Sequence, residues 1–313
     1  MDGEKWIYMK GIILLIPVIL ISCSNEPANK IPGEKKKSDS AVITNSVADT
    51  INKNVWEPLV YDTSKKYIYL TFDDGPQNGT SACMNLCKKL GVKATFFMVG
   101  EHVMSKRLQG LVDSIRNAYP NLLLANHSYT HAANDKYKFF YQHPQIAGED
   151  FFKAQESLKV PYKIIRLPGN NAWVTDNGIK SSKMVRDVCN ELDSADYNVI
   201  GWDAEWRFSH DRKCRPVGSP EKLAGEVINE LMKKETHTKN HIIVLAHDRM
   251  FQRPEDAEEL LQLILLLKQN PNVVFETIDH YPGLDIKGNN LHKPLRGNKP
   301  HKDSLIIADS AKI

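Results

Sequence analysis

Short apolar segments alternate with amphipathic helical segments along residues 56–286, and this alternation restricts the fold more than any other feature of the chain. The apolar segments are rich in β-branched and aromatic residues, which favour buried β-strands. Strands that alternate with helices usually belong to a parallel sheet that helices cover from outside. The expected strands are 67–72, 94–99, 122–125, 163–167, 199–202, 242–246 and 273–277.

Six helices are expected between these strands. The Ser-Pro pair at 219–220 is typical of a helix start, with serine as the cap and proline in the first turn. Seven strands in about 220 residues fit a closed or nearly closed α/β barrel of parallel strands, and a doubly wound open sheet is the alternative. The expected helices are 81–90, 104–118, 144–158, 181–194, 220–234 and 254–269.

Residues 1–23 have the pattern of an export signal. Two lysines flank an apolar stretch at 11–21, which is too short to span a bilayer comfortably. The Ser-Cys pair that follows resembles the lipobox of bacterial lipoproteins, in which the cysteine is lipidated. We therefore expect an exported, membrane-anchored lipoprotein of the bacterial cell envelope, held through a lipidated Cys23. An uncleaved signal anchor is the alternative.

The rest of the chain divides by composition. Residues 24–55 are polar and carry a lysine run, which predicts a linker, and 287–313 form a polar, basic tail that we expect to be disordered. Residues 56–286 remain as one barrel domain. The net charge of +3 is too small to indicate nucleic-acid binding, and no protein partner is inferred. Whether Cys189 and Cys214 pair is left open.

Titratable or metal-binding side chains follow five of the expected strands. In parallel α/β folds the carboxyl ends of the strands face one side, so these side chains predict an active site there. Two adjacent carboxylates at the end of a buried strand are costly unless a cation or a base lies close to them. The residues are Asp73 and Asp74, His127 and His131, Arg166, Asp203 and Glu205, and His247.

One aspartate and two histidines form a candidate metal site. Asp74, His127 and His131 supply ligands that suit Zn²⁺ with open positions for water and substrate, and Co²⁺ or Ni²⁺ would also fit. Because adjacent residues that leave a strand point in different directions, the second aspartate is free to act as a general base.

These groups together predict metal-assisted hydrolysis. His247 could protonate the leaving group, and Arg166 could pair with a carboxylate and keep it ionised. The alternatives are a buried core imidazole for His247 and a structural ion pair for Arg166. A bound divalent ion would lower the pKa of water and polarise a carbonyl group.

Five segments resemble, in order, the motifs of the polysaccharide deacetylase family, carbohydrate esterase family four. The resemblance covers about residues 65–280 and implies a distorted, incomplete (β/α)7 barrel. It also implies a metal-dependent site that removes acetyl groups from carbohydrate. The matching segments are TFDDGP at 71–76, HSYTH at 127–131, RLPG at 166–169, WDAEW at 202–206 and LAH at 245–247.

The resemblance implies a role for each residue of these motifs. Asp73 would be the general base, oriented by Arg166, and His247 the general acid. The metal ligands would be Asp74, His127 and His131. The substrate would contact Pro168, Gly169, Trp206 and Leu245, with the Gly169 N–H meeting the oxyanion.

Two positions depart from the family pattern. Members usually carry tyrosine where Gly169 stands, so one aromatic wall of the site is missing. Members also usually carry aspartate before the tryptophan of the fourth motif, where it tunes the acid histidine. Here Glu205 precedes Trp206, and Asp203 lies two residues earlier, so either acid could serve; position favours Glu205 slightly.

The expected substrate is an acetylated glycan. Family habit and the predicted export favour N-acetyl groups over the O-acetyl esters of xylan-type polymers. Two further alternatives stand beside a deacetylase. One is a lipoprotein that binds glycans on this fold without catalysis, and the other is a metal hydrolase of a non-glycan amide.

Overall fold

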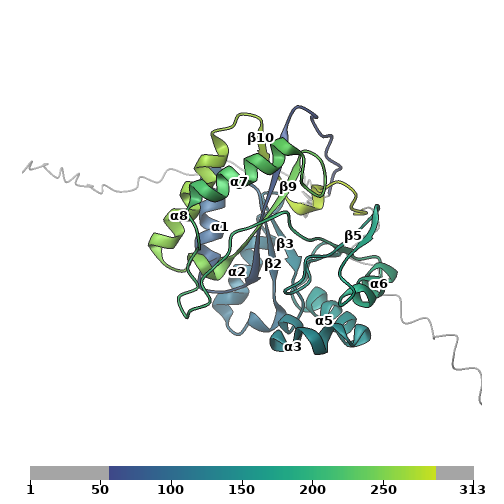
Figure 1. The fold of residues 1–313 in the computed structure, drawn as a ribbon. Coiled ribbons are helices and arrows are strands. Elements are labelled where there is room, and N and C mark those ends of the chain that lie inside the picture. The colour runs from purple at the N-terminus through teal and green to yellow at the C-terminus, as the bar shows by residue number, and fades with distance from the viewer. Residues whose placement is uncertain (1–55, 287–313) are drawn as a thin grey trace, which may run out of the picture. The chain divides into compact units, whose positions relative to one another are not determined.

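The computed structural model of the chain describes residues 56–286, which form one curled sheet with helices outside it (Figure 1). The strand order is β6-β5-β7-β4-β3-β2-β1-β9-β8, and β10 pairs with β1. The two edges, β6 and β8, do not pair, so the sheet is an open half-barrel. The strands are β1 (Lys66–Gly75), β2 (Ala94–Met98), β3 (Leu122–Asn126), β4 (Ile164–Ile165), β5 (Trp173–Thr175), β6 (Gly178–Lys180), β7 (Asn198–Val199), β8 (Ala204–Glu205), β9 (His241–His247) and β10 (Val273–Phe275).

The predicted α/β class and incomplete barrel are confirmed, with one correction to the pairing. β1 pairs in parallel with β2, β9 and β10, and each of the seven predicted strands has a counterpart. The hairpin of β5 and β6 is antiparallel, and β5 also pairs antiparallel with β7. This hairpin and β8 were not predicted because two or three residues are too few to show a periodicity.

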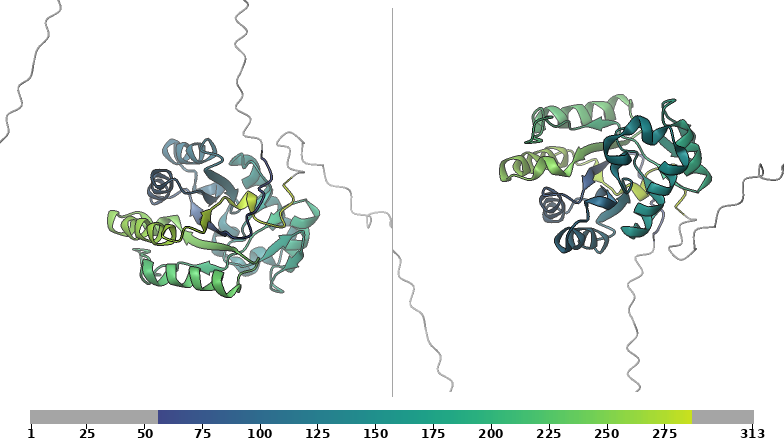
Figure 2. Two further views of the ribbon diagram at one scale, coloured as in Figure 1. Left: turned by 90° about the horizontal axis from the view of Figure 1, so that it is seen from above. Right: turned by 90° about the horizontal axis from the view of Figure 1, so that it is seen from below.

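Helices line the outer side of the sheet in both end-on views (Figure 2). The six predicted helices are present. Helix α6 begins five residues later than expected, after the hairpin of β5 and β6. Within residues 56–286, three short 3₁₀ helices occur at Gly100–His102, Asp248–Phe251 and Ile278–His280. The α-helices are α1 (Thr80–Leu90), α2 (Lys106–Arg116), α3 (His131–Asp135), α4 (Tyr137–Tyr141), α5 (Pro144–Ser157), α6 (Arg186–Ser194), α7 (Pro220–Lys233) and α8 (Pro254–Lys268).

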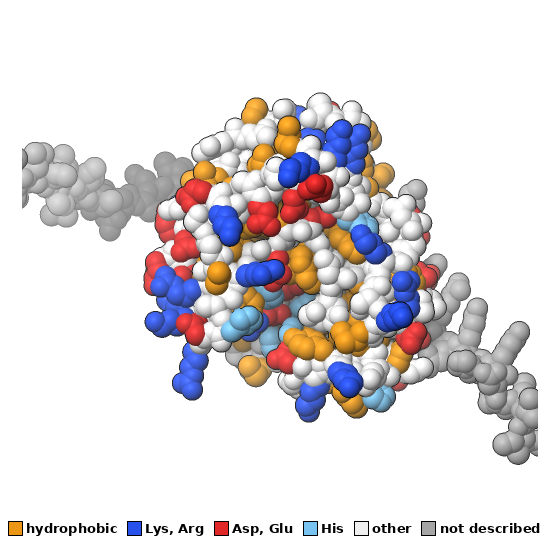
Figure 3. Space-filling view, viewed as in Figure 1, with side chains coloured by type: hydrophobic (Ala, Val, Ile, Leu, Met, Phe, Trp, Pro, Cys, Tyr) orange, Lys and Arg blue, Asp and Glu red, His pale blue; other side chains and the backbone are white. Residues whose placement is uncertain are grey.

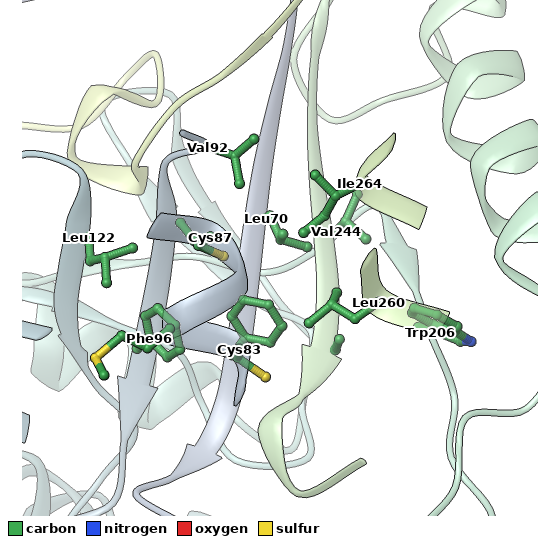
Figure 4. Close-up of a cluster of buried hydrophobic side chains, with 14 of the residues drawn as sticks. Leu70, Cys83, Cys87, Val92, Phe96, Leu122, Trp206, Val244, Leu260 and Ile264 are labelled. Atoms are coloured by element: carbon green, nitrogen blue, oxygen red, sulfur yellow. The ribbon is translucent and has the colours of Figure 1, made fainter. Parts of the chain in front are cut away.

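The central strand β1 is buried on both faces, as a parallel sheet requires. Leu70 on one face contacts the cluster that α1 and α8 cover, where Cys83, Leu260 and Ile264 approach the sheet (Figure 4). Cys83 therefore serves as an apolar core residue. The four cysteines of the described part, Cys83, Cys87, Cys189 and Cys214, are all free thiols, so Cys189 and Cys214 do not pair.

The interior face of the half-barrel contains a buried histidine whose protonation should control stability at acid pH. His241 is 6% exposed and stacks on Tyr67, with ring centroids 4.9 Å apart. Its Nδ1 lies 2.9 Å from the Tyr69 hydroxyl. Burial lowers the pKa of His241 to about 4, whereas the unfolded chain titrates near 6.5.

We expect this histidine to make the protein acid-sensitive. Its contribution is fully present above pH 6.5 and is lost as the pH falls towards 4, because the unfolded chain binds the proton first. The loss amounts to up to about 3 kcal/mol. Denaturant unfolding of the wild type and of His241→Gln at pH 7, 5.5 and 4 measures it. An equally steep loss in the variant would contradict this assignment.

The predicted signal segment with Cys23, the linker and the basic tail lie outside the described residues, and they stay predictions. Within residues 56–286 none of the helices has the length and apolar character needed to cross a membrane.

Candidate active site

Sheet register brings the reactive side chains to one edge of the half-barrel. Asp73 on β1 lies directly opposite His247 on β9, and both strands end within two residues of this pair. His127 follows β3, and Arg166 follows β4. In the face shown in Figure 3, acidic and histidine side chains lie together in a hollow bordered by hydrophobic side chains. The predicted convergence of distant segments is therefore present.

Asp74, His127 and His131 form a compact set of candidate metal ligands. Asp74 Oδ1 lies 3.3 Å from Nε2 of His127 and 3.0 Å from Nε2 of His131. One ligand atom from each residue lies within 4.8 Å of the other two. Asp74 Oδ1 is buried and accepts no hydrogen bond within the described residues. A buried carboxylate oxygen facing two imidazole nitrogens is a suitable position for a divalent cation.

The opposite nitrogens of both imidazoles are already occupied. Nδ1 of His127 lies 2.9 Å from the carbonyl oxygen of Arg166, which accepts its proton. Nδ1 of His131 lies 2.6 Å from Oδ1 of Asp135. Because Nδ1 of each ring is the donor to these partners, Nε2 is the nitrogen that faces the Asp74 carboxylate and is available as a metal ligand.

Charge around Asp74 favours its ionised form. Burial opposes ionisation, but the adjacent imidazoles of His127 and His131 and the nearby His247 outweigh it, and the pKa of Asp74 lies well below its usual range. Arg249 adds a cation on the other side, with Nη2 2.6 Å from Asp74 Oδ2. One oxygen of Asp74 thus binds an arginine while the other faces the two histidines.

The segment that carries His131 has an unusual backbone. The five residues of α3 turn in the left-handed sense, with φ values between 50° and 64°. Non-glycine residues lose roughly 1–2 kcal/mol each in this conformation. The Thr130 side chain holds the turn by accepting from the Ala133 N–H at 2.8 Å. The result is that Asp135 lies beside His131, and such retained strain is common at functional sites.

Asp73 and Arg166 form a buried ion pair next to the ligand set. Nη1 of Arg166 lies 2.9 Å from Asp73 Oδ1, and both side chains are almost fully buried. The guanidinium also donates to the Thr71 hydroxyl and to the carbonyl oxygens of Ile200 and Gly201. Asp73 Oδ2 remains on the side of His127, at 3.8 Å from its Nε2. The arginine therefore orients one oxygen and leaves the other facing the site.

His247 approaches the same carboxylates from β9. Its Nε2 lies 3.9 Å from Asp74 Oδ2, and the ring contacts Phe208 edge-on, with centroids 4.8 Å apart. Burial lowers the pKa of His247, although Asp74 and Asp73 act in the opposite direction. Its Nδ1 is buried and has no hydrogen-bond partner among residues 56–286.

The structure brings neither predicted acid to this Nδ1. Both oxygens of Asp203 accept backbone N–H groups, from His237 at 2.6 Å and from Ile243 at 2.8 Å, and the side chain lines a cavity of about 630 Å³ on the hairpin side. Glu205 lies in β8, opposite Leu245, and makes no hydrogen bond or ion pair with His247 in the described part of the chain. Motif position alone cannot show this, because the direction of each side chain depends on the sheet register.

The four predicted substrate contacts differ in their exposure to solvent. Gly169 is exposed, and its N–H donates no hydrogen bond within residues 56–286, whereas Pro168 is buried and its carbonyl oxygen accepts from Tyr141 at 2.6 Å. Leu245 and Trp206 are 3% and 2% exposed. Trp206 packs against Phe251 in the core, so little of its ring is available to a substrate.

Sequence reasoning missed several residues that contact the site. Arg249 follows His247 by two positions, and Asp135 follows His131 by four, a spacing that could have indicated a contact. Asp248 is buried and accepts from the Thr80 hydroxyl, and burial raises its pKa to about 7. No local pattern marked Arg249, since its partner Asp74 lies 175 residues away.

Comparisons with known proteins agree with this geometry. A family model described as polysaccharide deacetylase matches residues 61–169. The peptidoglycan-N-acetylglucosamine deacetylase of Bacillus cereus is 30% identical over 253 residues, which cover 78% of this chain and 84% of that protein. A bifunctional xylanase/deacetylase of Pseudobutyrivibrio xylanivorans is 41% identical over 68 residues, and the match spans 22% of this chain and 11% of that protein.

A solved structure has the same fold. The catalytic domain of the peptidoglycan N-acetylglucosamine deacetylase from Eubacterium rectale matches with a TM-score of 0.51 and 24% sequence identity, over 74% of this chain and 96% of that chain.

Proposed function

Because this chain belongs to the polysaccharide deacetylase family, we propose that it is a metal-dependent enzyme that hydrolyses N-acetyl groups of an acetylated glycan. The observation that carries the proposal is the position of Asp74, His127 and His131 between the side chains of Asp73 and His247. One protein ligand set, one candidate base and one candidate acid thus meet at the carboxylates of Asp73 and Asp74.

The ligand set fits a divalent ion. Asp74 Oδ1 is a buried acceptor without a hydrogen-bond partner in the described residues, and two imidazole Nε2 atoms face it. One carboxylate and two imidazoles suit Zn²⁺, and Co²⁺ or Ni²⁺ would also be accepted. An ion bound there would polarise the acetyl carbonyl and lower the pKa of water.

Asp73 is positioned to take a proton from the attacking water. Arg166 binds its Oδ1 and favours the carboxylate, while Oδ2 stays on the side of the ligand set. The water oxygen bonds to the acetyl carbon, and the carbonyl oxygen becomes an oxyanion. Gly169 follows the end of β4 by four residues, and its N–H, which donates no hydrogen bond within residues 56–286, would donate to that oxyanion.

His247 would complete the reaction as the general acid. When the bond between the acetyl carbon and nitrogen breaks, the nitrogen needs a proton to leave as an amine. Nε2 of His247 is the imidazole nitrogen on the side of Asp74. Burial lowers the pKa of His247, while the Asp74 and Asp73 carboxylates act in the opposite direction and favour the protonated ring that a proton donor needs. Products are acetate and a glycan with a free amino group.

The substrate class is supported by the relatives and by the expected location. The B. cereus and E. rectale proteins are both named as deacetylases of peptidoglycan N-acetylglucosamine. We propose that this chain is exported and anchored through Cys23, so that it meets envelope glycans. An O-acetyl esterase and a glycan-binding protein without catalysis are the competing functions.

The test is acetate release by the purified full-length protein from chitotetraose, peptidoglycan and O-acetylated xylan, together with its metal content. We expect release from the N-acetylated glycans to fall below detection after chelation and to return with Zn²⁺ or Co²⁺, because the ion that the ligand set would hold polarises the acetyl carbonyl. Acetate from xylan alone would support the esterase. Glycan binding without acetate from any substrate would refute the enzyme proposal.

A further inference from the structure

The space where a side chain at position 169 would lie is occupied by the ring of Tyr137, which comes from another segment of the chain. A Cβ atom built on Gly169 would lie 2.9 Å from Cε1 and 3.1 Å from Cζ of Tyr137. Gly169 also has a φ of +64°, which L side chains rarely adopt. The ring of Tyr137 therefore occupies the space next to Gly169, and no side chain fits at 169 while the ring stays there.

Two hydrogen bonds hold Tyr137 in this position. Its hydroxyl donates to Asp135 Oδ1 at 3.0 Å, the same oxygen that accepts from Nδ1 of His131. Tyr141, from the same short helix α4, donates to the carbonyl oxygen of Pro168 at 2.6 Å and fastens the helix to the Gly169 segment. The position of the ring is thus linked on one side to a candidate metal ligand and on the other to the Gly169 backbone.

The ring also faces the reactive centre. Its centroid lies 6.2 Å from that of His131, with the planes nearly perpendicular. Burial and the carboxylates of Asp135 and Asp74 raise the pKa of Tyr137, so the phenol stays neutral at physiological pH. The side chain is half-buried, which leaves part of it for contact with a ligand.

We propose that Tyr137 is a specificity-determining residue whose ring forms the wall of the acyl site on the Gly169 side and restricts the acyl group to the size of acetyl. This inference rests on the proposed deacetylase function. An acyl carbon within reach of both the Gly169 N–H and the ligand set must lie beside the ring that contacts Gly169 and His131. Tyr137 of α4 then supplies the aromatic wall that a tyrosine at position 169 would otherwise form.

Acyl-length selectivity tests the proposal. Chitotetraose carrying N-acetyl, N-propionyl or N-butyryl groups is hydrolysed with the Zn²⁺-loaded wild type, Tyr137→Ala and Tyr137→Phe. In Tyr137→Ala we expect the ratio of kcat/KM for propionyl over acetyl to rise about tenfold or more, since one methylene group in a closed apolar pocket discriminates by roughly that factor. Tyr137→Phe keeps the ring and should leave the ratio unchanged.

A matched control comes from the same helix. Phe139 is 48% exposed, so Phe139→Ala removes an aromatic ring from α4 without opening the Gly169 side, and its ratio should equal that of the wild type. Thermal unfolding and zinc content check the integrity of each variant. If Tyr137→Ala does not fold, Tyr137→Leu, which also shortens the wall, is used in its place.

The outcomes separate this inference from the function on which it rests. A wild type that releases acetate, with a propionyl-to-acetyl ratio that is unchanged in Tyr137→Ala, or in Tyr137→Leu where that variant takes its place, overturns the wall and leaves the deacetylase intact. An equal rise of the ratio in Phe139→Ala also overturns it, because the effect would then belong to α4 as a whole. A wild type without activity on any acylated glycan overturns both proposals.

Discussion

Replacing Asp73 with asparagine is expected to lower kcat by a factor of about 10²–10⁴ without removing the bound metal, because the variant keeps the shape of the side chain and loses the base. The amide oxygen of the new side chain would still accept from Arg166, and the three candidate ligands are untouched. The measurements are the rate of acetate release and the metal content after gel filtration, at a temperature well below unfolding.

The neighbouring aspartate provides the contrast. Asp74→Asn removes a ligand oxygen, so we expect it to lose metal and activity together. Asp193→Asn, an exposed change at the end of α6, should alter neither. Full activity in Asp73→Asn would exclude Asp73 as the base, and loss of its metal would instead place Asp73 among the ligands.

The second large effect is on stability. Arg166→Met should cost about 3–5 kcal/mol, because it leaves the Asp73 carboxylate buried without its cation. Two backbone acceptors, the carbonyl groups of Ile200 and Gly201, would also lose their donor. In a domain of this size the melting temperature should fall by roughly 10 °C, and denaturant unfolding at pH 7 gives the free energy.

A double-mutant cycle tests whether the ion pair is the cause. In Asp73→Asn/Arg166→Met the unpaired charge is absent, so the loss should be smaller than the sum of the two single losses. Arg107→Met, at an exposed position in α2, controls for removal of an arginine. Strict additivity in the cycle would show that Arg166 stabilises the fold through packing against Phe97, 4.3 Å from its guanidinium, and not through Asp73.

The main strands and helices were predictable because their signals are local. β1, β2, β3 and β9 are apolar runs of five or more residues, and α8 carries a continuous Leu and Ile face. The candidate metal set was also predictable, since its residues follow strands whose carboxyl ends must share one side of a parallel sheet. Strands of two or three residues, such as β5, β6 and β8, are too short to show an apolar periodicity.

The partner of His247 shows where local reasoning fails. Glu205 and Asp203 lie at the expected place in the chain, yet Asp203 binds two backbone N–H groups, and within residues 56–286 Glu205 makes no hydrogen bond or ion pair with the imidazole. Side chains of successive residues in a strand point to opposite faces, so a motif specifies a segment and not a direction.

The sequence by itself therefore determined the class of fold, the edge of the sheet where chemistry gathers and the identity of the candidate ligands, because each follows from patterns within a short stretch of chain. Only the tertiary structure decided that Arg249 binds Oδ2 of Asp74 and that Tyr137 fills the space beside Gly169. The physical reason is that both contacts join segments whose relative position depends on strand register and helix packing, which no local pattern encodes.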